Sequence, residues 1–170
     1  MPSPTQAALS PHTGILAILG KRLTRVCHGE LAVDEPLESD DLGPLELSFD
    51  DGSSLQARLI SDGESATYAI HASPPALLYA QNCDWRRVDL SERALYRLLL
   101  AARVVAIDAL LFGAPIASAP VVAGYVFHFD NQRRLSFYNA GDTARLYFDA
   151  LPPSPTSPFE LRPMRISERS

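Results

Sequence analysis

The chain has 170 residues, of which 46% are hydrophobic and 21% are charged. These values match one globular domain with a single core, and they exclude a disordered chain and a disulfide-dense secreted scaffold. The net charge of −5 argues against phosphate backbones as the main partner, because such binding relies on clustered Lys and Arg. We therefore predict no direct binding of nucleic acid.

The apolar segments do not predict a secretion signal or a membrane span. No Lys or Arg precedes the short apolar run 15–19, so the charged part of a signal peptide is missing. The longest apolar stretch, 98–112, is interrupted by Arg103 and Asp108 and falls short of the about 20 residues that a membrane helix needs. We expect a cytoplasmic protein that does not bind membranes.

Proline marks both ends of the chain. Pro2, Pro4 and Pro11 punctuate the start, and four more prolines fall within 151–158. Proline lacks a backbone N–H and fixes φ, so these segments are poorly suited to the interior of a sheet. The sequence predicts a flexible N-terminal tail at 1–14, a single domain at 15–150 and a Pro-rich C-terminal tail at 151–170.

Within the domain, the first clear pattern is a three-stranded meander. Residues 45–49 alternate apolar and polar side chains, as a strand with one buried face does. Asp51 and Gly52 form a typical tight turn, and 54–59 return with the same alternation. A third strand is predicted at about 66–71.

The same pattern recurs about 80 residues later. Leu47, Leu55 and Tyr68 then coincide with Phe127, Leu135 and Phe148, and with one further residue of offset 19–26 coincides with 100–107. The sequence predicts an α+β, mostly β fold with two pseudo-repeated antiparallel meanders of about four strands, at 19–71 and 100–148.

A single helix is predicted between the two repeats. Asp89 is suited to cap it with Glu92 three positions on, and Leu95, Leu98 and Leu99 supply an apolar stripe. We place this helix at about 90–102.

Negative charge is concentrated in one region. Between residues 30 and 65 there are eleven acidic residues and the single basic residue Arg58, a net charge of −10. Such a field speeds encounter with a basic partner, although acidic turns are also ordinary in solvated hairpins. The predicted partner-binding residues are Glu35, Glu38, Asp40, Asp41, Asp50, Asp51, Asp62 and Glu64, together with Trp85 as a surface anchor.

No motif for catalysis or for a cofactor stands out. The four histidines lack metal-ligand spacing, neither cysteine lies in a nucleophile motif, and no phosphate-binding glycine loop occurs. We therefore predict no catalytic residue, no metal and no cofactor. A metal-dependent hydrolase remains a less favoured alternative, in which Asp62, Glu64 and Asp142 converge in the fold.

Turn and strand signatures at 43–52, 61–65 and 138–142, with Trp85 ahead of Asp89, resemble those of small, poorly characterised bacterial proteins. Proteins of this type are similar to the immunity and accessory proteins encoded beside toxins. The resemblance covers about 19–148 and implies a non-enzymatic immunity or antitoxin-like inhibitor, with an acidic surface that binds a basic, co-encoded protein. The alternative is a structural or accessory subunit, including a homodimer through exposed strand edges.

Overall fold

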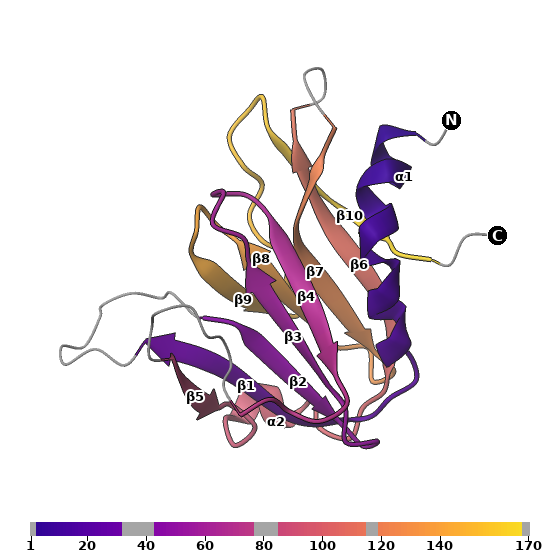
Figure 1. The fold of residues 1–170 in the computed structure, drawn as a ribbon, viewed down its shortest axis with the longest axis vertical. Coiled ribbons are helices and arrows are strands. Elements are labelled where there is room, and N and C mark those ends of the chain that lie inside the picture. The colour runs from indigo at the N-terminus through magenta and orange to yellow at the C-terminus, as the bar shows by residue number, and fades with distance from the viewer. Residues whose placement is uncertain (1–2, 32–42, 77–84, 115–118, 168–170) are drawn as a thin grey trace.

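The computed structural model describes residues 3–31, 43–76, 85–114 and 119–167, and these are mostly β (Figure 1). The first sheet has the strand order β4-β3-β2-β1-β5 and the second the order β10-β6-β7-β8-β9, with every pair antiparallel. The strands are β1 (Leu23–Leu31), β2 (Leu45–Phe49), β3 (Ser54–Leu59), β4 (Ala66–His71), β5 (Trp85–Asp89), β6 (Val104–Gly113), β7 (Val121–Phe129), β8 (Arg134–Asn139), β9 (Ala144–Phe148) and β10 (Glu160–Arg165). The helical elements are α1 (Pro4–Leu9), the 3₁₀ helix η1 (Ser10–Ile18) and α2 (Ala94–Arg97).

The predicted mostly β fold is confirmed, and both halves of the chain follow one topology. Each half forms a four-stranded meander, β1–β4 or β6–β9, as the sequence predicts. Each sheet also gains a fifth strand, because β5 returns to pair with β1 and β10 returns to pair with β6. The sequence pattern did not predict the fifth strands, because a long connecting segment separates each of them from its meander.

The strand registers show where the two halves correspond. Val26 pairs with Leu47 as Ile107 pairs with Phe127, and Leu47 pairs with Leu55 as Phe127 pairs with Leu135. The fourth strand departs from the predicted offset: Leu55 faces Ile70, whereas Leu135 faces Phe148. Phe148 therefore corresponds to Ile70 and not to Tyr68, because the last turn of the second meander is two residues shorter.

The two halves meet in a reciprocal set of backbone hydrogen bonds around an isolated antiparallel bridge between Arg22 and Arg103. The Leu23 amide donates to the Ala102 carbonyl (2.9 Å), and the corresponding Val104 amide donates to the Lys21 carbonyl (3.0 Å). The guanidinium groups repeat the exchange: Arg22 donates to the Ala101 carbonyl at 3.0 Å and Arg103 to the Gly20 carbonyl at 2.6 Å. This reciprocity defines an approximate twofold axis between the halves.

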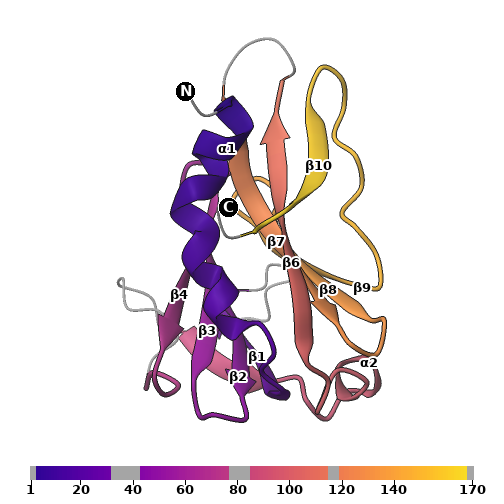
Figure 2. The same cartoon turned by 90° about the vertical axis from the view of Figure 1, so that its right-hand side faces the viewer.

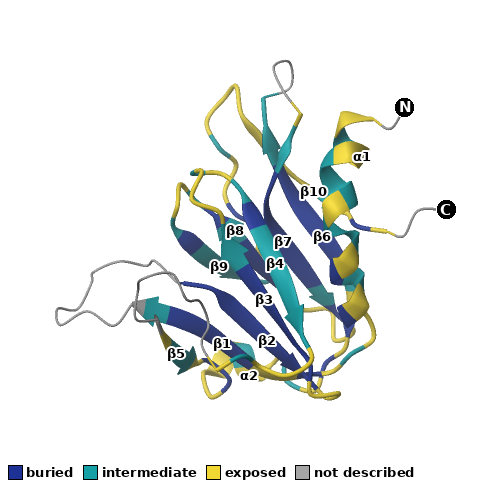
Figure 3. Ribbon diagram, in the orientation of Figure 1, coloured by how far each residue is buried: buried dark blue, intermediate teal, exposed yellow. Residues whose placement is uncertain are grey.

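The two sheets lie face to face around one core, and the helical segments lie beside their edges (Figures 1 and 2). Inward residues of both sheets, such as Leu47, Leu55, Phe127 and Phe137, are fully buried. Figure 3 shows the buried residues gathered along the middle strands of both sheets. In the described part of the chain, no helix is long and apolar enough to cross a membrane.

In the described residues, both predicted tails contain regular secondary structure. Residues 4–18 form α1 and η1, and Ile15 and Ile18 of η1 are fully buried. The Pro-rich segment links β9 to β10, which lie at opposite edges of the second sheet, so it crosses the outer face. There the Ala150 carbonyl accepts a hydrogen bond from the Ser136 hydroxyl at 2.8 Å. β10 tolerates Pro163 because it is an edge strand.

The predicted helix at 90–102 is reduced to α2, which has four residues. Its end repeats the end of η1: the Leu100 amide donates to the Arg97 carbonyl as the Leu19 amide donates to the Leu16 carbonyl. The chain must then turn into β6, and Ala101 adopts a positive φ of 65° that ends the helical geometry. Asp89 accepts from the Ser91 amide and does not cap the helix. η1 and the α2 region are thus two copies of one element.

Gly20 and Ala101 provide a matched test of the twofold relation. They occupy corresponding positions with φ of 79° and 65°, a region that favours glycine. A Cβ on Gly20 would meet no atom within 4 Å, so only the backbone angle opposes a side chain there. We expect Gly20→Ala to lower the free energy of unfolding by about 1 kcal/mol and Ala101→Gly to raise it by up to about 1 kcal/mol. Urea denaturation measures both, and changes of equal sign would contradict the equivalence.

Candidate functional site

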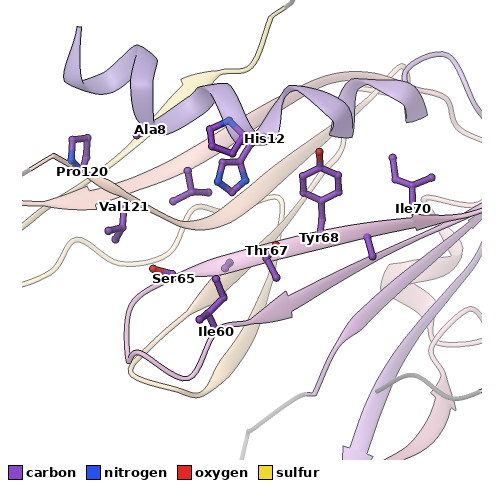
Figure 4. A pocket seen from close by; sticks show the side chains of 13 residues that line it. Ala8, His12, Ile60, Ser65, Thr67, Tyr68, Ile70, Pro120 and Val121 are labelled. Atoms are coloured by element: carbon purple, nitrogen blue, oxygen red, sulfur yellow. The ribbon is translucent and has the colours of Figure 1, made fainter. Parts of the chain in front are cut away.

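A groove of about 620 Å³ lies between the N-terminal helical segment, the edge strand β4 and the start of β7 (Figure 4). Its volume falls within the range of protein ligand sites, about 300–1,000 Å³. The lining is neutral and mostly apolar, and it comprises Ala8, Pro11, His12, Ile60, Ser65, Ala66, Thr67, Tyr68, Ala69, Ile70, Pro120, Val121 and Val122. The fold forms this groove because η1 lies beside both sheets.

Three aromatic residues tie η1 to the two sheets beside this groove. Nδ1 of His12 and the hydroxyl of Tyr125 share a hydrogen bond of 2.7 Å. Tyr68 of β4 packs edge-on against Tyr125 of β7, with ring centroids 6.0 Å apart. Gly14 lets η1 lie close to Tyr68, since a Cβ on residue 14 would lie 2.6 Å from the Tyr68 hydroxyl oxygen. His12, Tyr68 and Tyr125 are called the aromatic anchor below.

Burial keeps the aromatic anchor uncharged. It lowers the pKa of His12 and raises that of Tyr125. Burial also raises the pKa of Tyr68, against the opposing effect of a hydrogen bond with the Ile15 backbone. Neutral His12 and protonated tyrosines therefore prevail at neutral pH. Their hydrogen-bonding groups serve to hold η1 in place.

The groove follows the free edge of β4. The Ile60 amide donates to the Ser65 carbonyl at 2.9 Å, which fixes the alternation of hydrogen-bonded pairs along β3 and β4. It follows that the backbone groups of Ala66, Tyr68 and Ile70 point away from β3, and all three residues line the groove. Within the described ranges, no residue forms a backbone hydrogen bond with these outward groups. The groove thus presents backbone donors and acceptors in addition to an apolar surface.

The predicted acidic residues separate into two turns. Asp50 and Asp51 lie before β3, Asp62 and Glu64 lie after it, and all four are exposed. β3 has six residues, so about 20 Å separates the turns. The structure does not bring these four carboxylates together. Of the other predicted residues, Glu35, Glu38, Asp40 and Asp41 lie outside the described residues, and Trp85 is placed only as the first residue of β5.

The described acids bind groups of their own turns or of the segment that precedes β1. A hydrogen bond from Lys21, at 2.7 Å, together with others from Ser53, holds the pKa of Asp51 well below its usual range. Asp50 accepts from the Arg22 amide, and Asp62 accepts from the amides of Glu64 and Ser65. These contacts stabilise the turns, whatever else the exposed carboxylate oxygens bind.

The carboxylates of the hydrolase alternative lie at the contact between the two halves. Asp142 accepts a hydrogen bond of 2.8 Å from the Gly63 amide, between Asp62 and Glu64. Asn139 reinforces this contact by donating to the Ser65 carbonyl at 2.9 Å. Among the residues that the structure describes, no group of three or more His, Cys, Asp or Glu is placed to hold a metal ion.

A second polar cluster lies on the outer face of the first sheet. Glu46 is fully buried and receives two hydrogen bonds of 3.0 Å from Arg87, while Arg87 also donates to the Pro75 carbonyl. Cys27 is its cross-strand neighbour, and burial raises the pKa of that thiol to about 11. The thiol is therefore protonated at neutral pH and is a poor nucleophile. Period-two alternation places Glu46 on the outer face, but only the covering chain makes it buried.

His128 lies on the outer face of the second sheet, opposite Phe127 and Phe129, as alternation predicts. Its Nε2 is 2.7 Å from an oxygen of Asp108 on β6. Asp108 also pairs with Arg165 of β10. This cluster joins β7, β6 and β10, and its carboxylate is already shared by two partners.

Comparisons with protein-family models, with curated proteins and with solved structures find no match to this chain. Its function must therefore be inferred from its own residues. Among the sites described above, the β4 groove alone combines a cavity with unused backbone hydrogen-bonding groups in the described residues. Sequence reasoning missed it because its walls come from three distant segments, and the one signal present was His12 within a region expected to be a tail.

The lowered pKa of His12 predicts a pH dependence of stability. The unfolded chain binds a proton on this imidazole near pH 6.5, whereas the folded chain does so only at lower pH. The contribution of neutral His12 to the free energy of unfolding is therefore fully present above pH 6.5. It is lost as the pH falls from 6.5 toward the pKa of His12 in the folded chain. We expect the urea concentration at the unfolding midpoint to decrease as the pH is lowered from about 8 to about 5.

The variant His12→Gln isolates the contribution of the aromatic anchor. Its urea midpoint should depend less on pH than that of the wild type, with a remainder from His28, whose pKa burial also lowers. An unchanged pH dependence in His12→Gln would show that the imidazole of His12 is not the responsible group.

Proposed function

We propose that this protein is a non-enzymatic protein-binding module that holds an extended segment of a partner protein along the free edge of β4. The observation that carries the proposal is the row of outward backbone groups on Ala66, Tyr68 and Ile70, inside a groove of about 620 Å³. An added strand satisfies such groups through main-chain hydrogen bonds, a recurring mode of peptide recognition.

The lining defines the chemistry of the bound segment. Val121 and Val122 form one wall and Ile70 and Ala69 another, while no charged side chain contributes to the lining. A carboxylate or ammonium group inserted there would lose its water without gaining a partner. The preferred segment is therefore neutral, with apolar side chains at alternate positions.

The non-enzymatic part of the proposal rests on the state of the reactive groups in the described residues. The imidazole of His12 is engaged by Tyr125, and the thiol of Cys27 is protonated and buried. Asp108 and Glu46 are each paired with arginine. These groups hold strands and helices together, which leaves the groove as a binding surface.

Selection from a library of random peptides of about ten residues tests the proposal. We expect enrichment of neutral, extended sequences, and we expect binding to depend on the backbone of the peptide. Methylation of alternate peptide nitrogens should abolish binding in one frame, whose N–H groups face β4, and spare it in the other frame. Equal effects in both frames would exclude strand addition.

A pair of valine variants locates the binding surface. Val121→Asp places a carboxylate in the groove and should weaken binding of the selected peptides at least about tenfold. Val105→Asp adds the same charge at a valine that is 54% exposed outside the groove, and should leave binding unchanged. If the selected peptides bound Val121→Asp as tightly as the wild type, the groove would not be the binding site.

A second candidate is an immunity or antitoxin-like inhibitor that meets a basic partner protein through its acidic surface. It is favoured by the net charge of −10 between residues 30 and 65 and by the exposure of Asp50, Asp51 and Glu64 on the turns beside β3. A structural or accessory subunit, or a homodimer, is compatible with the same exposed edges.

Charge reversal separates this candidate from the groove. If the acidic surface binds the partner, changing Asp40, Asp41, Asp50 and Asp51 together to Lys should slow association with a co-purifying basic protein by at least about tenfold at low salt. A surface plasmon resonance series at increasing salt measures this effect. Unchanged association would eliminate the acidic surface as the binding site.

We also propose that the chain arose by duplication of one half. The shared strand order, the reciprocal bonds around Arg22 and Arg103 and the paired positive φ values support this origin. The surfaces of the two halves later diverged, because the excess of acidic residues lies in the first half. Accordingly, the scaffold is symmetric and the binding groove is not.

A further inference from the structure

The helix α1 packs far less deeply than the 3₁₀ helix that follows it. No residue of α1 is buried, whereas η1 contributes Ile15, Ile18 and the hydrogen bond that His12 shares with Tyr125. Leu9, the last residue of α1, is its only side chain packed against the core cluster in the described structure. Figure 3 shows α1 exposed or half-buried along its whole length.

Cavities flank α1 on two sides. The β4 groove includes Ala8, and a second cavity of about 310 Å³ includes Pro4 and Thr5 together with Glu160 and Arg162 of β10. Pro120, the residue before β7, lines both cavities, so the two approach each other at this point. Figure 4 shows Pro120 in the lining of the β4 groove, near Ala8 of α1. A hydrogen bond of 3.2 Å from Arg162 to the Thr5 hydroxyl is a polar contact between α1 and the second sheet.

The second half of the chain closes its core without an equivalent of α1. Residues of η1 correspond to the α2 region at an offset of 81, as the matching turns before Gly20 and Ala101 show. The same offset places α1 on 85–90, which form β5 and the buried Leu90. The fold unit therefore does not require α1, which is an addition to the first half.

We propose that α1 is an autoinhibitory lid over a longer groove, which joins the two cavities when the lid lifts. This inference rests on the proposed function, because the lid regulates the same β4 site. Opening occurs at the junction between α1 and η1, while the aromatic anchor keeps η1 in place. A neutral extended segment that fills the joined groove competes with α1, so that its apparent affinity is reduced by the fraction of closed molecules.

Native-state hydrogen exchange of the full chain tests the lid without any ligand. The Ala7 amide donates to the Ser3 carbonyl within α1, and the Val104 amide donates to the Lys21 carbonyl at the twofold contact. We expect Ala7 to exchange at least about a hundredfold faster than Val104 and to be insensitive to low urea, as in local opening. Exchange of Ala7 at the rate and urea dependence of Val104 would overturn the lid, because α1 would then open only on global unfolding.

Two leucine variants sharpen this test. Leu9→Ala removes the apolar contact of the lid and should speed exchange at Ala7 about tenfold without making it urea-dependent. Exchange at Val104 should also become faster, because both openings are measured from the same closed state. Leu95→Ala makes the same change at a leucine of α2 that is 54% exposed, and should alter neither amide. If Ala7 in Leu9→Ala exchanged at the wild-type rate, the Leu9 contact would not hold α1 closed, and the proposal would be overturned.

The selected peptides distinguish failure of the lid from failure of the proposed function. Leu9→Ala should bind them several-fold more tightly than the wild type, in proportion to the faster opening of α1. If no peptide binds, the proposed function fails while hydrogen exchange still decides whether α1 lifts. If peptides bind with unchanged affinity although Ala7 exchanges faster, the helix opens but does not compete, and the autoinhibitory role is wrong.

Discussion

The rest of the structure depends on the reciprocal backbone pairing around Arg22 and Arg103. Each half supplies amide and carbonyl groups that the other half needs, so neither meander meets its hydrogen-bonding requirements at this point alone. The pairing also fixes where each first strand begins, and hence which residues of β1 and β6 face the core. Because both halves leave the contact with the same geometry, two meanders of the same topology close on each other around one apolar interior.

Twofold symmetry at the contact leads to asymmetry at the edges. The helical segment that precedes each meander lies beside the sheets, but only the first is preceded by α1. In the first half, the aromatic anchor holds this segment against the sheets. In the second half, Tyr96 of α2 packs against Phe148, with ring centroids 6.4 Å apart. The open groove is therefore found beside β4, where the added helix extends over a free strand edge.

Polar groups on the outer faces have a structural explanation in the crossing segments. Each fourth strand lies at the opposite edge of its sheet from the fifth strand. In the described residues of the two connections, Pro74–Pro75 and Pro152–Pro153 occupy corresponding places. Backbone carbonyls of these segments accept hydrogen bonds from Arg87 and Ser136. The buried carboxylate of Glu46 is neutralised there by Arg87, as a desolvated charge requires. Acidic composition alone therefore overstates the charge available to a partner.

Local pattern was sufficient for the meanders, since period-two alternation and Asp-Gly turns depend only on neighbouring residues. The sequence by itself determined that the chain is mostly β, that its unit recurs at about 80 residues, and where the acidic turns lie. Only the tertiary structure decided that the proline-rich ends contain η1 and β10, that Asp50 and Asp62 lie apart, and that β4 borders a groove. The reason is physical: fifth strands, buried ion pairs and grooves arise from contacts between distant segments, whose pairing no local periodicity encodes.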